Sequence, residues 1–112
     1  MIEKVKVGAQ TFRIVERYKR DDGMLSDGTL GYTLDDENLI VIEKSLSKSK
    51  KQLTLLHEIL HAIRMERETT IRPRKTDDYY VWEHYFISIY ENSLLYVLKD
   101  NPELISWLQE ED

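Results

Sequence analysis

The segment Leu53–Ile63, LTLLHEILHAI, constrains the fold of this chain more than any other stretch. Drawn as a helix at about 100° per residue, it is apolar over about half of its surface. The apolar side chains are those of Leu53, Leu55, Leu56, Ile59, Leu60, Ala62 and Ile63. The residues that flank the central HEILH are all uncharged. This pattern predicts a helix in the middle of the fold, with its apolar half packed against other elements.

The polar sector of this helix holds His57, Glu58 and His61. Residues four apart lie one above the other on the same helix face, so the two imidazoles can bind one tetrahedral Zn²⁺. Glu58 follows His57 by about 100° and lies beside the metal, where it can take a proton from zinc-bound water. The motif predicts one zinc ion held by His57 and His61, with Glu58 as the catalytic base of a metallopeptidase.

A catalytic zinc usually has three protein ligands and a water. The HExxHxxGxxH class is excluded, because Arg64 and Arg67 stand where it needs glycine and histidine. Glu83 is the predicted third ligand, on a second helix expected from about Asp77 to Lys99. It lies at the centre of an apolar stripe made of Tyr79, Trp82, Phe86, Ile87, Tyr90, Leu94 and Leu98. A carboxylate that faces a core is costly unless something neutralises it, and zinc on the facing helix would do so.

Other roles remain open for this second helix. Glu83 can instead pair with an arginine or accept hydrogen bonds from tyrosines. His84, at the edge of the stripe, is the alternative ligand or a donor to an oxyanion. Tyr79 and Tyr80 can serve as such donors too, although aromatic residues near a helix start more often belong to the core.

The first part of the chain is rich in residues that favour strands. Residues 2–7 and 11–18 predict one hairpin, and residues 31–34 and 39–42 predict a second. Between the hairpins, residues 20–31 carry three of the four glycines and predict a loop. Residues 39–42 lack polar alternation, so both faces of that strand are expected to be covered.

Ser45, Ser47 and Ser49 are candidate N-caps for the HEILH helix, which should end near Arg67. A connection over residues 69–76 follows, and Asp77 and Asp78 are candidate caps of the long helix. Asn101 and Pro102 then predict a short last helix that runs to about Gln109. The whole pattern predicts a single α+β domain over residues 1–112, with an antiparallel sheet of three or four strands packed on the HEILH helix and a second long helix.

Composition excludes several classes of protein. The 112 residues are 41% hydrophobic and 33% charged, with a net charge of -5 and no basic stripe, so we expect no nucleic-acid partner. The absence of cysteine excludes a disulfide scaffold and a thiolate zinc site. No apolar run approaches the roughly 20 residues that span a bilayer, and the N-terminus has no apolar signal region. We therefore expect a cytoplasmic protein with no membrane partner.

The order of a strand hairpin, the segment LIVIEKSLSKSKKQLTLLHEILHAI and a Glu-bearing helix resembles the small zincin metallopeptidases of the gluzincin type. Residues 31–63 are most similar to the ImmA/IrrE-like peptidases of prophages and mobile elements. The resemblance covers residues 31–98 and rests chiefly on HEILH. It implies a zincin-like fold, with His57, His61 and Glu83 as zinc ligands and Glu58 as general base. It also implies that strand 39–42 is the cleft edge that binds an extended substrate.

Two functions from different classes follow. The first is a zinc endopeptidase acting on a peptide or protein substrate. The alternative is a latent or non-catalytic zinc-binding module that acts in protein interaction, as the similarity in size to the latent-looking minigluzincins suggests. An open path from solvent to Glu58, and cleavage of an unfolded protein, would distinguish the first from the second.

Overall fold

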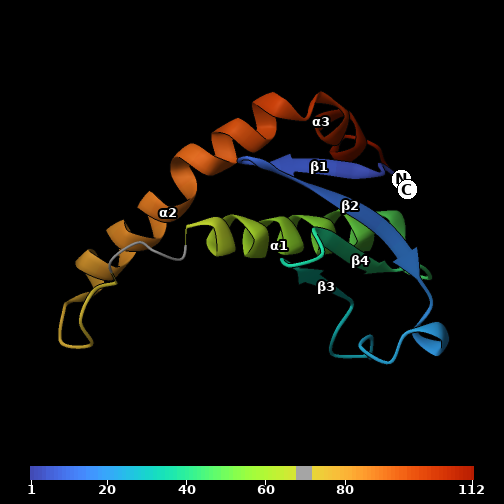
Figure 1. Cartoon of the computed structure of the whole chain (residues 1–112), viewed down its shortest axis with the longest axis horizontal. Helices are drawn as coiled ribbons and strands as arrows, with labels where there is room; N and C mark the ends of the chain where they lie inside the picture. The colour runs from blue at the N-terminus through green and yellow to red at the C-terminus, as the bar shows by residue number, and fades with distance from the viewer. Residues whose placement is uncertain (68–71) are drawn as a thin grey trace.

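A computed structural model describes residues 1–67 and 72–112 of the chain (Figure 1). The strands are β1 (Lys4–Val7), β2 (Gln10–Arg17), β3 (Gly31–Leu34) and β4 (Leu39–Glu43), with a 3₁₀ turn, η1 (Lys19–Asp21), after β2. The helices are α1 (Lys48–Glu66), α2 (Tyr79–Asp100) and α3 (Pro102–Leu108). The α+β class and both hairpins are confirmed. None of the described helices is long and apolar enough to cross a membrane.

The four strands form one sheet in the order β1-β2-β4-β3. The expectation of a purely antiparallel sheet is wrong at one pairing, because β2 and β4 run parallel. The two hairpins are antiparallel as predicted, and they join side by side through their second strands. β4 is therefore an interior strand, and all five of its residues are buried. This burial explains why its sequence shows no polar alternation.

One face of the sheet packs against α1. Its core contains Phe12, Ile40 and Ile42 from the sheet, together with Leu55 and Ile59 from α1. The alternate residues of β4 point the other way and pack with Leu25 from the loop between β2 and β3. α2 and α3 lie beside β1 in Figure 1 and close the main core through Ile89, Val97, Leu104 and Trp107.

The three candidate N-cap serines at the start of α1 have three different partners. Ser47 is the N-cap, and its side chain accepts a hydrogen bond from the Lys50 N–H at 3.3 Å. Ser45 instead bonds Glu43, and Ser49 bonds Asp112. α1 thus begins and ends within a few residues of the predicted positions.

Asp78 is the N-cap of α2, and its side chain accepts a hydrogen bond from the Val81 N–H at 3.1 Å. Of the connection predicted over residues 69–76, residues 69–71 lie outside the described part of the chain. Asn101 and Pro102 begin α3 as predicted, but the Asn101 side chain makes no capping hydrogen bond.

Candidate metal centre

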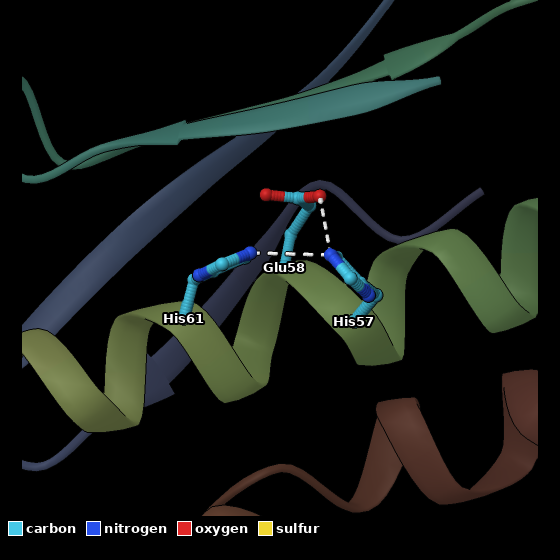
Figure 2. A group of neighbouring side chains, drawn as sticks. All are labelled: His57, Glu58 and His61. Carbon is cyan, nitrogen blue, oxygen red and sulfur yellow. Dashed lines mark hydrogen bonds and ion pairs between the residues drawn. The ribbon is translucent and has the colours of Figure 1, made fainter. Parts of the chain in front are cut away.

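α1 presents His57, Glu58 and His61 toward β3 from successive turns (Figure 2). The two histidine Nε2 atoms lie 3.1 Å apart, and Glu58 Oε2 lies 4.0 Å from His57 Nε2. Within the described residues, these three side chains form the one group whose ligand atoms gather closely enough to hold a metal, all within 4.8 Å of one another. The helix spacing therefore produces the convergence that the motif predicts.

The histidine pair fits a tetrahedral zinc ion. Two nitrogen ligands at about 2.0–2.1 Å from the metal, with a tetrahedral angle between them, are about 3.3 Å apart. The observed separation of 3.1 Å is close to that value. Two imidazole nitrogens that face each other also need a cation or a shared proton between their lone pairs. Both imidazole rings are exposed, so an ion can reach them from solvent.

Glu58 is buried beneath β3, with only 4% of its surface exposed. The Thr33 hydroxyl lies 2.9 Å from Glu58 Oε1 and 3.2 Å from the Glu58 backbone oxygen. One carboxylate oxygen is thereby held by the sheet, while the other lies on the side of the histidines. The sequence placed Glu58 in the polar sector of the helix but gave no sign of the Thr33 contact, because the two residues are 25 positions apart.

A cleft of about 580 Å³ lies between α1 and β3, with the histidines along one wall. That wall is a row at four-residue spacing, formed by Leu53, His57, His61 and Met65. Leu53 was expected in the core-facing half of the helix, but 62% of its surface is exposed. It extends the cleft wall one turn before His57, so an apolar surface adjoins the candidate metal centre.

The opposite wall contains β3 rather than strand 39–42. β4 pairs with β2 on one side and with β3 on the other, so it cannot offer an edge to a substrate. β3 lies at the end of the sheet, and in the described part of the chain no strand pairs with its outer side. The inference that strand 39–42 is the cleft edge is therefore wrong, and Gly31–Leu34 is that edge.

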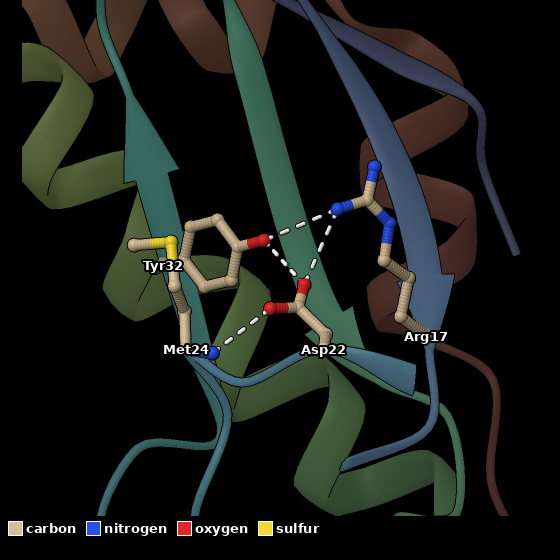
Figure 3. Close-up of polar contacts among 4 residues, drawn as sticks. All are labelled: Arg17, Asp22, Met24 and Tyr32. Atoms are coloured by element: carbon tan, nitrogen blue, oxygen red, sulfur yellow. Dashed lines mark hydrogen bonds and ion pairs between the residues drawn. The ribbon is translucent and has the colours of Figure 1, made fainter. Parts of the chain in front are cut away.

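The loop before β3 is fastened to the sheet by a polar cluster (Figure 3). Asp22 accepts hydrogen bonds from the Tyr32 hydroxyl, from the Met24 N–H at 3.0 Å and from Arg17 Nη1 at 3.2 Å. The pKa of Asp22 lies below its ordinary value, mainly because its carboxylate accepts the hydrogen bond from Tyr32. Burial is the main cause that raises the pKa of Tyr32, and the Asp22 hydrogen bond adds to it. This cluster fixes the segment that supplies Gly28, Thr29 and Leu30 to the cleft.

The structure does not bring Glu83 to the histidines. Glu83 is exposed on α2 and lies outside the group of ligand atoms around His57 and His61. His84 is exposed as well, and its ring packs on Tyr80 with the ring centroids 4.4 Å apart. Tyr79 and Tyr80 are both exposed. The role of Glu83 as third ligand stays a prediction, without support from this arrangement.

The premise for Glu83, a core-facing stripe centred on it, is wrong. α2 instead packs with Tyr85, Ile89, Tyr90, Leu94 and Val97, whose centre lies about 60° around the helix axis from Glu83. Phe86, Ile87 and Leu98 of the expected stripe are exposed. α2 is apolar on almost every side, so its pattern alone does not determine which side is buried.

Neither a protein-family model, nor a curated protein, nor a solved structure gives a match to this chain.

Proposed function

We propose that this chain is a zinc-dependent metallopeptidase of the zincin class, of the gluzincin type that the sequence resembles. The observation that carries the proposal is the pair of imidazole Nε2 atoms 3.1 Å apart, beside the Glu58 carboxylate and open to a cleft of about 580 Å³. The spacing suits a zinc ion, and the cleft is large enough for a segment of peptide.

His57 and His61 would hold the metal, each through Nε2. Zinc supplies a Lewis acid that polarises the scissile carbonyl and lowers the pKa of a water. Glu58 takes the proton of the attacking water on Oε2, the oxygen on the side of the histidines, and then gives it to the leaving amine. The outer edge of β3 offers backbone N–H and C=O groups to an extended substrate, which would add to the sheet as a further strand.

The decisive experiment combines metal analysis with digestion of a peptide library. Wild-type protein prepared without nickel should contain about one zinc per chain and should cleave peptides. Glu58→Gln should keep the zinc and lose activity by at least about 100-fold, because the carboxylate is a base and not a ligand. His57→Ala should lose both. Wild-type protein without zinc, or a Glu58→Gln variant that loses zinc as His57→Ala does, would contradict the assignment of roles.

One observation favours the second candidate, a latent or non-catalytic zinc module. The described residues bring only His57, Glu58 and His61 together, without a third histidine or carboxylate ligand. A zinc site completed by another molecule, or by Glu58 itself, would bind metal without hydrolysing peptides. Stoichiometric zinc together with no cleavage of any library member would select this candidate over the peptidase.

A further inference from the structure

At Gly31, the backbone of β3 packs directly against the side chains of Thr54 and Glu58 on α1. A Cβ added to Gly31 would lie 2.8 Å from Thr54 Cγ2 and 2.8 Å from the Val41 carbonyl oxygen. It would also lie 3.4 Å from Glu58 Cγ. Only a glycine allows this approach, and the approach brings the next residue on the same face of β3, Thr33, within reach of α1.

Because β3 lies so close to α1, Thr33 donates a hydrogen bond to the Glu58 carboxylate from the side of the sheet. Its register partner on β4 is Ile40, which belongs to the core that packs on α1, so Thr33 faces the helix. Its single hydroxyl proton is shared between Glu58 Oε1 at 2.9 Å and the Glu58 backbone oxygen at 3.2 Å. The threonine therefore holds both ends of one residue, its backbone and its side chain.

We infer that Thr33 is a positioning residue, which fixes the Glu58 carboxylate so that Oε2 faces the histidine pair. This inference rests on the proposed peptidase function. With Oε1 bonded to Thr33, the carboxylate cannot rotate freely, and the oxygen that remains is the one 4.0 Å from His57 Nε2. Without the bond, the carboxylate would sample orientations that place neither oxygen beside the attacking water, and a general base must lie within hydrogen-bond reach of its proton.

The test compares Thr33→Val, which keeps the shape and removes the hydroxyl, with Thr33→Ser, which keeps the hydroxyl. Thr33→Val should lower kcat by about 10–100-fold with KM within about 2-fold and zinc content unchanged, as expected for a group that orients another. Thr33→Ser should restore most of kcat. Thr11→Val, an exposed threonine on β2 far from the cleft, is the matched control and should behave as wild type. A Thr33→Val variant with wild-type kcat in an active enzyme would overturn the inference.

A measurement independent of activity separates this inference from the proposed function. Thr33→Val should lower the denaturant midpoint more in the wild-type background than in Glu58→Ala, where only the bond to the backbone oxygen remains. Equal shifts in both backgrounds would overturn the inference whether or not the protein cleaves peptides. Unequal midpoint shifts in a protein without peptidase activity would show that the hydrogen bond between Thr33 and the Glu58 carboxylate exists. They would at the same time refute the proposed function and, with it, the role of Thr33 in catalysis.

Discussion

Glu43, the last residue of β4, is a buried carboxyl group with 2% of its surface exposed. Its Oε2 accepts hydrogen bonds from the Ser45 hydroxyl at 2.6 Å and the Ser45 N–H at 2.9 Å. The hydroxyl bond is the main cause that holds the pKa of Glu43 below its ordinary value of 4.5, while burial opposes it. Ser45→Ala should lower the free energy of unfolding at pH 7 by about 1.5–3 kcal/mol, because a bond to a charged group is lost.

The effect of Ser45→Ala should depend on pH in a definite direction. A folded-state pKa below the unfolded value stabilises the protein above the unfolded pKa, and that contribution is lost as the pH falls through the folded pKa. The difference between wild type and Ser45→Ala should therefore shrink as the pH falls below the ordinary value of 4.5. Urea unfolding at pH 7 and pH 3 measures it, and an equal difference at both values would contradict the assignment.

Among the individual site residues, the sequence predicted those whose positions depend on helix spacing alone. His57 and His61 converge because residues four apart share a helix face, whatever the rest of the fold does. Thr33 could not be predicted, because its contact with Glu58 depends on where β3 lies against α1. The glycine two positions earlier was a signal of close approach, but glycine at that place equally fits the preceding loop.

Two isoleucines on α2 test which side of that helix is buried. Ile89 is 2% exposed and Ile87 is 49% exposed, although the sequence predicted Ile87 in the core-facing stripe. Ile89→Ala should lower the free energy of unfolding by about 2–5 kcal/mol, because it leaves a cavity. Ile87→Ala should cost less than about 1 kcal/mol. Chemical denaturation of the two variants measures both values, and the reverse order would show that the expected stripe is the buried one.

The elements themselves were more predictable than their faces and neighbours. Both hairpins and all three helices follow from local patterns of strand formers, turn residues and caps. The parallel pairing of β2 with β4 does not, because the loop over residues 18–30 gives no indication of which edge of β2 receives the second hairpin. The buried side of α2 was equally undetermined, since Tyr79–Leu98 carries only two formal charges, on Glu83 and Glu91.

At the scale of the whole molecule, the C-terminal segment holds the start of α1. The Gln52 side-chain amide donates to the carbonyl oxygens of Trp107 and Glu110, each at 2.8 Å. Lys48 forms an ion pair with Glu110 at 3.0 Å. These contacts join residues more than 50 positions apart at the end of α1 that precedes the histidines. The middle turns of α1, which carry the candidate metal centre, contact β3 through the Thr33–Glu58 hydrogen bonds, so different parts of the chain hold the start and the middle of α1.

Asn101, between α2 and α3, binds the outer edge of β1 as a neighbouring strand would. Its Oδ1 accepts from the Lys6 N–H at 2.8 Å, and its Nδ2 donates to the Lys6 carbonyl oxygen at 2.8 Å and to the Val97 carbonyl oxygen at 2.7 Å. The side chain is therefore fully engaged, which explains why it does not cap α3. The contact spans 95 positions, so it closes the sheet edge with the end of the chain.

Asn101→Ala should lower the free energy of unfolding by about 2–4 kcal/mol, because it leaves several backbone groups without partners. Asn101→Asp keeps the acceptor for the Lys6 N–H but sets a carboxylate against two carbonyl oxygens, so it should also destabilise the fold. Asn92→Ala, at an exposed position of α2, is the matched control and should stay within about 0.5 kcal/mol of wild type. Urea unfolding measures all three. An Asn101→Ala variant as stable as Asn92→Ala would mean that α2 and α3 are held to β1 by apolar packing alone, through Val97, Leu104 and Trp107.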